Sequence, residues 1–231
     1  MSKTIIVVGF GPGISTGVAE KFGAEGFNVA LVGRSKDRLD AGVAALKAKG
    51  ANAAAFVADA SNSADIGAVV GKVRAAFGPI TAIHWNAYGG AEAGDFLAAD
   101  PAAIRSVFDV AIVGLVTAVQ AALPDLKAAG DGAVLITNGA FGDLNVQIDE
   151  AAANSKNMGL ALANASKHKL SRLLAVRLKS EGVHVGEVMI AGSIKGTPWA
   201  TNNPNAIDPA TVGDKFFALY RDRSENFARL S

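Results

Sequence analysis

Residues 3–17 read KTIIVVGFGPGISTG, and the rest of the chain is organised around this stretch. Its apolar and β-branched run, Thr4 to Val8, leads directly into three glycines, Gly9, Gly11 and Gly13. A continuous run of this kind is typical of a parallel strand that is covered on both faces. The apolar residues that follow have helical spacing. The stretch therefore predicts a strand, a glycine-rich turn and a helix.

This arrangement suits the pyrophosphate of a dinucleotide. Glycines permit a tight turn and close approach of the backbone, and a helix N-terminus offers free N–H donors and a partial positive charge. The spacing is not G-x-G-x-x-G, because position 14 is an isoleucine. A glycine-rich loop alone also fits an ordinary strand-to-helix turn, so other parts of the chain must decide.

Composition limits the function classes. The 231 residues are consistent with one domain, and a content of 50% apolar and 19% charged residues indicates a compact globular protein. The net charge of +1 gives no electrostatic argument for nucleic acid or an anionic membrane. Cysteine is absent, which excludes disulfides and thiolate metal sites. With no signal-peptide pattern and no long apolar run, we expect a soluble cytoplasmic protein without membrane spans.

Beyond the first strand, strand-like and helix-like segments alternate. Predicted strands cover residues 4–8, 28–33, 53–58, 80–85, 133–137 and 183–190. Predicted helices cover residues 14–25, 35–49, 61–77, 100–127, 154–181 and 209–221, with an irregular polar stretch before 154. Six alternating strands imply right-handed βαβ units, and hence an α/β fold with a single Rossmann-like, doubly wound parallel sheet. Ligands of such sheets bind beyond the C-terminal ends of the strands.

Several segments at these strand ends, in this order and spacing, resemble the short-chain dehydrogenase/reductase family over nearly the whole chain. They are Gly9-x-x-x-Gly13-Ile14-Ser15, Asp59, Trp85-Asn86-Ala87-Tyr88, Phe108-Asp109-Val110 through Gly114 to Leu123-Pro124, Ala165-Ser166-Lys167, and Ala191-Gly192-Ser193-Ile194 with Thr197-Pro198. The resemblance implies one dinucleotide-binding domain over residues 1–231, with a substrate lid around 192–222. It assigns cofactor binding to Gly9, Gly11, Gly13, Ile14, Ser15, Arg34, Asp59, Asn86, Ala87, Lys167, Gly192 and Ile194.

The residue after the second strand selects the cofactor. An acid there would accept hydrogen bonds from the adenosine ribose and repel a 2′-phosphate. This chain instead has Gly33 followed by Arg34. An arginine can bind a phosphate with two N–H groups and can lie against an adenine ring. We therefore expect NADP(H) rather than NAD(H), and interpret Lys36 and Arg38 as a solvated helix face.

The catalytic residues that the resemblance implies are mostly replaced. When the chain is aligned on Lys167, the family tyrosine falls on Ala163, the serine on Gly139 and the asparagine of the fourth helix on Ala111. The family lysine also holds the nicotinamide ribose, a role that needs no tyrosine. Reduction of a carbonyl requires a proton donor. The standard mechanism is therefore excluded, and the chain is identified as a divergent member of the family.

Few residues are substitutes for the missing groups. Tyr88 is a candidate acid, although a role as pocket wall or packing aromatic fits it as well. The polar neighbours Asn138, Asn164 and Ser166 could bind a substrate oxygen without donating a proton. Three scattered histidines form no metal site. Of these, His84 is expected to be a hydrogen-bonded core residue, and His168 a surface or interface residue.

Three acids of the polar stretch and one tryptophan complete the candidates. We interpret Asp143, Asp149 and Glu150 as solvated loop charges, with selection of a cationic or hydroxylated substrate as the alternative. Trp199 suits either the lid or a subunit interface. The two long helices correspond to the pair with which family members pack across a twofold axis, which implies a homodimer or homotetramer.

Three functional hypotheses remain. The first is an NADP(H)-dependent oxidoreductase that acts on a small carbonyl or an activated alkene with a non-standard proton donor. The second is a catalytically inactive homologue that serves as a nucleotide-binding sensor or an inactive subunit. The third is non-redox chemistry with a vestigial cofactor site. The retained cofactor motifs argue against the third, and analogy with the family favours the first.

Overall fold

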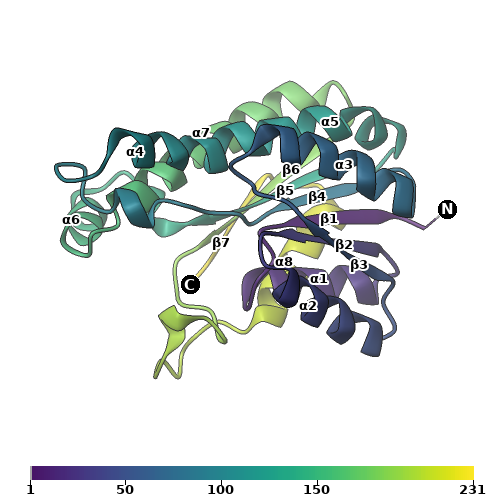
Figure 1. The fold of residues 1–231 in the computed structure, drawn as a ribbon, viewed down its shortest axis with the longest axis horizontal. Helices are drawn as coiled ribbons and strands as arrows, with labels where there is room; N and C mark the ends of the chain where they lie inside the picture. Colours follow the sequence, from purple (N-terminus) through teal and green to yellow (C-terminus); the bar gives the residue numbers. More distant parts are fainter. Residues whose placement is uncertain (1) are drawn as a thin grey trace.

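The computed structural model of this chain describes residues 2–231, which form one seven-stranded sheet with helices on both faces (Figure 1). All neighbouring strands are parallel, in the order β3-β2-β1-β4-β5-β6-β7. The predicted doubly wound α/β fold is confirmed. The strands are β1 Thr4–Val8, β2 Asn28–Gly33, β3 Ala53–Val57, β4 Ala82–Trp85, β5 Ala133–Gly139, β6 His184–Ile190 and β7 Phe227–Leu230.

The helices form two layers, each with its own apolar core. One layer contains α1 Ile14–Ala24, α2 Lys36–Ala48 and α8 Pro209–Asp222, and the other contains α3 Ser63–Phe77, α5 Leu115–Ala128 and α7 Met158–Lys179. Phe22 and Phe216 lie in the first core, and Trp85 and Leu115 lie in the second. The sheet is therefore covered on both faces, as its near-continuous apolar strands require.

Side-chain caps explain where several helices begin. Ser35 Oγ accepts a hydrogen bond from the Arg38 amide, which confirms Ser35 as the predicted N-cap of α2. Asn62 caps α3 in the same way, through the amides of two residues of the first turn. Asp100 and Asp208 cap the two helices that start with proline. Short polar side chains at these positions satisfy N–H groups that have no partner within the helix.

The sequence prediction was wrong at two elements. The stretch predicted as irregular contains α6 Val146–Asn154, and a seventh strand, β7, follows the last helix. Ala152 is the one fully buried residue of α6, so its helical period is not visible in the sequence. Strand β7 has only four residues and lies at the sheet edge beside β6. Both elements are too short to give a periodic signal.

One continuous helical segment, Pro101–Ala128, is long and apolar enough by length and composition to cross a membrane. This was not expected from the sequence. The segment consists of α4 Pro101–Phe108, a π-helical turn at Asp109–Gly114, and α5. In the fold, α5 packs against α3 and β4, and its residues Leu115 and Leu126 are part of the core. A core helix of a globular protein has the same apolar composition.

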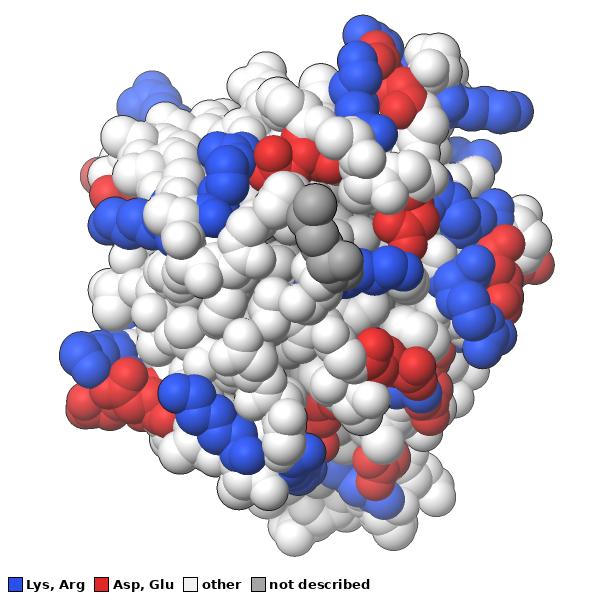
Figure 2. All heavy atoms as spheres, turned by 90° about the vertical axis from the view of Figure 1, so that its right-hand side faces the viewer, with Lys and Arg blue, Asp and Glu red and all other residues white. Residues whose placement is uncertain are grey.

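The face that carries the N-terminal ends of the strands has a mixed charge pattern. Figure 2 shows acidic and basic side chains interspersed around an uncharged central area on this face. Lys3, just before β1, pairs with Asp131, just before β5, at 2.6 Å. The buried Tyr220 donates its hydroxyl to the same carboxylate at 2.5 Å. Tyr220 therefore lies at the N-terminal ends of the strands. A ligand is expected at the opposite, C-terminal ends.

Candidate functional site

The strand order reverses at β1, which pairs with β2 on one side and β4 on the other. The loops that follow β1 and β4 touch at this point, because Asn86 Nδ2 donates to the Gly9 carbonyl at 3.1 Å. Gly9 has a φ of 81°, and a Cβ built there would lie 2.4 Å from the Ala87 nitrogen. Only glycine fits this position. The predicted residues Gly9, Asn86 and Ala87 thus meet at the crevice where doubly wound sheets bind ligands.

The glycine loop is braced by the first residues of α1. The buried Ser15 hydroxyl donates to the Gly11 carbonyl and accepts from the Gly11 amide, both at 2.9 Å. Thr16 Oγ1 also donates to the Gly11 carbonyl. Gly13, with a φ of 87°, is the N-cap of α1 and provides no side-chain acceptor. The first N–H groups of α1 are therefore available to an anion.

Arg34 and Asp59 follow the neighbouring strands β2 and β3. Asp59 Oδ1 accepts hydrogen bonds from the Ser61 amide at 2.9 Å and from its hydroxyl at 2.8 Å. The amide of Ser61 contributes most to lowering the pKa of Asp59 below its usual value, and the positive charge of Arg34 lowers it further. The two predicted cofactor residues therefore lie near each other, with Arg34 exposed.

Two further cations begin α2. Lys36 pairs with Asp40 one turn along the helix, which confirms its interpretation as part of a solvated face. Arg38 is exposed, but its guanidinium reaches the glycine loop, because a Cβ built at Gly11 would lie 3.8 Å from Nη1. The prediction for Arg38 missed this contact. The signal that could have found it is its position in the first turn of α2, close to the C-terminal end of β2, where ligands of such sheets bind.

The segment after β6 lies against the glycine loop. A Cβ built at Gly13 would lie 2.6 Å from Thr197 Cγ2 and 3.1 Å from Ile194 Cγ2. The base of this segment is closed where the Ile207 amide donates to the Ser193 carbonyl at 2.8 Å. Gly192, before it, is exposed, and Ile194 is buried. The structure therefore brings the predicted lid into contact with Gly13.

Lys167 is the buried cation of the site. Its side chain projects from α7, the residue is 3% exposed, and its ammonium forms no hydrogen bond or ion pair within residues 2–231. Burial lowers the pKa of Lys167 to about 8, and the negative charge of Glu187 partly opposes this shift. Burial, together with the charge of Lys167, lowers the pKa of His84 to about 3. His84 Nε2 lies 2.9 Å from Thr137 Oγ1, which confirms the predicted core histidine.

The positions to which the resemblance assigns the catalytic residues have apolar or occupied surroundings. Ala111, in the π-helical turn, and Ala163, in α7, are buried in one small apolar cluster with Ala93 and Val107. Gly139 ends β5, and a Cβ built there would lie 2.7 Å from Asn164 Nδ2. The space of the implied serine side chain is therefore taken by the amide of Asn164.

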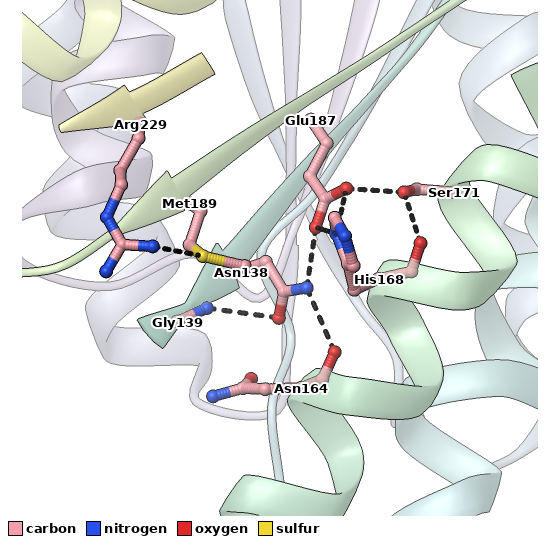
Figure 3. A network of polar contacts seen from close by, with 8 residues as sticks. All are labelled: Asn138, Gly139, Asn164, His168, Ser171, Glu187, Met189 and Arg229. Carbon is pink, nitrogen blue, oxygen red and sulfur yellow. Dashed lines mark hydrogen bonds and ion pairs between the residues drawn. The ribbon is translucent and has the colours of Figure 1, made fainter. Parts of the chain in front are cut away.

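A buried polar network lies beside Gly139 (Figure 3). Glu187, in β6, is 1% exposed and accepts hydrogen bonds from Asn138 Nδ2 at 2.6 Å and from Ser171 Oγ at 2.5 Å. His168 Nδ1 lies 2.8 Å from Glu187 Oε2. The His168 side chain is still 32% exposed, as a surface residue would be, but the prediction missed its pairing with the buried Glu187. The signal that could have found the network is Glu187 itself, a single acid in an otherwise apolar strand, since buried acids need partners.

The other candidates lie at the periphery. Tyr88 is 65% exposed in the loop after β4, and Trp199 is 63% exposed in the predicted lid. Asp143 was predicted to be a solvated loop charge, but it pairs with Arg229 of β7 at 2.8 Å. Asp149 and Glu150 lie exposed on α6, in agreement with the prediction of solvated charges. Within residues 2–231 no group of three or more histidines and acids is arranged to hold a metal ion.

Comparisons with known proteins agree on the family. The family model described as short chain dehydrogenase matches residues 3–206. The oxidoreductase UcpA of Salmonella typhimurium is 27% identical over 213 residues, which are 91% of this chain and 77% of that protein. A peroxisomal 2,4-dienoyl-CoA reductase of Arabidopsis thaliana is 32% identical over 134 residues, 56% of this chain. This match spans only 43% of the length of that reductase.

Solved structures share the fold. A short-chain dehydrogenase from Sphingobium yanoikuyae, in complex with NADPH, is 25% identical and superposes with a TM-score of 0.78. The superposition covers 98% of this chain and 87% of the other. The family model spans most of the chain, and the crevice between β1 and β4 carries the glycine loop of that family. This protein belongs to the short-chain dehydrogenase family.

Proposed function

We propose that this protein is an NADP(H)-dependent oxidoreductase that acts on a small carbonyl compound or an activated alkene. The observation that carries the proposal is the buried, unpartnered ammonium of Lys167. An uncompensated buried charge costs stability, and a hydroxyl-bearing ligand at this site would give it partners. The proposal is supported by UcpA, which is named an oxidoreductase, and by the dienoyl-CoA reductase, which is named for an alkene substrate.

The residues present fit a bound dinucleotide. The glycine loop leaves the N-terminal amides of α1 open to a pyrophosphate, and Lys167 would hold the nicotinamide ribose hydroxyls. Arg34 and Arg38 lie where a 2′-phosphate would be placed, and no acid follows β2, so we propose NADP(H) rather than NAD(H). The NADPH bound in the Sphingobium structure supports this choice.

The reaction would differ from the family mechanism in its proton donor. When bound, a reduced nicotinamide supplies the hydride. With alanine at positions 111 and 163, neither a tyrosine nor an asparagine relay is present to deliver the proton. Water or the substrate would then provide the proton. Tyr88 stays a candidate donor, and it would act from the loop after β4.

A specific observation also favours a second function. Ala111 and Ala163 carry only methyl groups, which cannot relay a proton, and both pack in one apolar cluster. Such a site suits a nucleotide-binding sensor or an inactive subunit of a homodimer or homotetramer. The exposed apolar side chains Leu173 and Val176 on α7 would lie in the subunit interface of that assembly.

The first test is a fluorescence titration with NADPH and, in parallel, NADH. Trp85 precedes the loop of Asn86, and Trp199 lies in the predicted lid, so both can report binding. We expect Arg34→Ala and Arg38→Ala each to weaken NADPH binding about 10- to 100-fold, because each removes a charge-assisted phosphate contact. NADH binding should change little. Lys36→Ala is the matched control, because Lys36 pairs with Asp40.

The outcomes separate the proposals. If neither NADPH nor NADH binds, both the oxidoreductase proposal and the sensor proposal are overturned. Equal weakening of NADPH and NADH by Arg34→Ala would contradict the 2′-phosphate assignment. If NADPH binds, its oxidation at 340 nm is followed with small ketones, vicinal diketones and enones. Oxidation of NADPH by one of these substrates would support the oxidoreductase proposal. NADPH binding without any oxidation would support the inactive homologue.

A further inference from the structure

Asn164 occupies a special position in α7. It follows Ala163, the position of the family tyrosine, and lies three residues before Lys167, so the two side chains share one side of the helix. The residue is 5% exposed, and its amide fills the space above Gly139. Asn164 therefore places the only carboxamide of α7 on the side of the helix that carries Lys167, at the end of β5.

The hydrogen-bond capacity of Asn164 is unused. Within residues 2–231 its side-chain amide neither donates nor accepts a hydrogen bond, and neither of its polar atoms is among the fully enclosed ones. In Figure 3 the carboxamide points away from the polar network. A carboxamide offers two donors and an acceptor, and buried polar groups are normally satisfied. An almost fully buried amide that is open on one side is suited to a ligand.

The two other polar neighbours are fully engaged. Asn138 Nδ2 donates to the Asn164 carbonyl and to Glu187, and its Oδ1 accepts from the Gly139 amide. Ser166 Oγ donates to the Leu162 carbonyl at 2.6 Å. Among the three polar neighbours Asn138, Asn164 and Ser166, only Asn164 has side-chain donors free for a substrate within residues 2–231. Its backbone is fixed by Asn138, so the free amide is also well positioned.

Two glycines make room for this arrangement. A Cβ at Gly139 would lie 2.7 Å from Asn164 Nδ2, and a Cβ at Gly142 would lie 2.8 Å from the Asn164 carbonyl carbon. A serine at position 139 and the amide of Asn164 would therefore compete for the same space. This mutual exclusion suggests that one group replaces the other in function as well as in volume.

We propose that Asn164 Nδ2 binds the carbonyl oxygen of the substrate, in place of the hydroxyl that the family places at position 139. This inference rests on the proposed function and narrows its substrate class to compounds with a carbonyl oxygen at the reacting centre, including conjugated enones. A fixed N–H donor stabilises the negative charge that develops on this oxygen. Asn164 donates a hydrogen bond only, so the proton comes from elsewhere.

The first test is a double-mutant cycle with 2,3-butanedione and NADPH. We expect Asn164→Ala to lower kcat/KM about 100- to 1,000-fold, the usual effect of removing an oxyanion donor. Gly139→Ser alone should also be impaired, because the new side chain clashes with the amide. The double variant should recover at least 10-fold over either single variant, because the serine hydroxyl then has room. Asn164→Leu, of similar shape, should be as impaired as Asn164→Ala.

Two controls guard the interpretation. Thr117→Ala should keep the parent kcat/KM, because the Thr117 hydroxyl of α5 donates to the Val113 carbonyl, one turn earlier, in an exposed hydrogen bond. The Kd for NADPH should stay unchanged in every Asn164 variant, since the amide acts on the substrate and not on the cofactor. The inference would be overturned if the losses of kcat/KM in the two single variants add up in the double variant. It would also be overturned if Asn164→Ala keeps the kcat/KM of the parent protein.

The second test does not depend on turnover. In ¹⁵N-labelled protein saturated with NADP⁺, addition of 2,3-butanedione should shift the side-chain amide signals of Asn164. The signals of Asn138 should move far less, because its amide is fully bonded. The side-chain amide signals that are missing from the spectrum of Asn164→Leu are those of Asn164. Unmoved Asn164 signals would refute the inference, whereas failure of the parent protein to bind NADPH refutes the proposed function first.

Discussion

At the scale of single residues, Lys167 shows how the site is built at the expense of stability. Its pKa of about 8, against an ordinary value of 10.5, means that the folded state disfavours the charged form. At neutral pH the lysine is still charged, so its burial costs about 3 kcal/mol at the usual conversion of pKa shift into energy. A residue that serves only stability would not be charged here.

We therefore expect Lys167→Met to raise the free energy of unfolding at pH 7 by about 2–3 kcal/mol and to weaken NADPH binding. Between pH 8 and pH 10.5 the unfolded parent chain keeps the lysine proton while the folded chain loses it. The stability of the parent protein should therefore rise with pH in this range, and that of the variant should not. Urea denaturation at pH 7, 8, 9 and 10 measures both. Lys179→Met, an exposed position of α7, is the control, and equal slopes for parent and Lys167→Met would contradict the assignment.

At the scale of elements, the crossing of α1 and α8 depends on two glycines. A Cβ at Gly17 would lie 1.9 Å from the Pro209 carbonyl oxygen, and a Cβ at Gly213 would lie 2.3 Å from the Gly17 carbonyl oxygen. Gly17→Ala must push the helices apart, and we expect a loss of about 1–3 kcal/mol or more. Gly71→Ala in α3 meets nothing within 4 Å and should stabilise by about 0.5–1 kcal/mol. Thermal unfolding measures the stability of Gly17→Ala and of Gly71→Ala. Similar changes in Tm for the two variants would refute the close crossing of α1 and α8.

The same elements show what the sequence can predict. Apolar runs marked six of the seven strands, and Ser35 marked a helix start, because local patterns decide these features. Strand β7 forms only because β6 offers a free edge, and this is a long-range condition. The fit of Asn164 above Gly139 is also long-range, since 25 residues separate the two positions. Sequence motifs pointed to the residues that we propose for the cofactor site, but not to the side chain that fills the space above Gly139.

At the scale of the whole molecule, the N-terminal and the C-terminal ends of the strands have different roles. The N-terminal edge holds the Lys3, Asp131 and Tyr220 cluster, which ties chain segments together, and the C-terminal edge holds the loops of the candidate site. The proposed cofactor would contact the loops after β1, β2 and β4 and the predicted lid. Its binding should therefore stabilise the entire fold rather than one element.

We expect NADPH at about 100 times its Kd to stabilise the protein by about 2.7 kcal/mol. For a domain of this size that is a rise in Tm of roughly 5–10 °C. NADH at the same concentration should give a smaller shift. Differential scanning calorimetry at several NADPH concentrations measures the effect, with Arg34→Ala as the control. A Tm independent of NADPH would argue against cofactor binding.

The position of Ser231 has a practical consequence for reporter design. The chain leaves β7 beside the base of the predicted lid, where the carbonyl carbon of Ser231 lies 4.0 Å from a Cβ built at Gly192 (Figure 1). A fluorescent protein fused after Ser231 would therefore emerge next to the segment that covers the glycine loop. A purification tag placed before Ser2 would emerge at the opposite edge of the sheet. An environment-sensitive dye attached at the C-terminus would thus lie beside the predicted lid and could report a change in its surroundings.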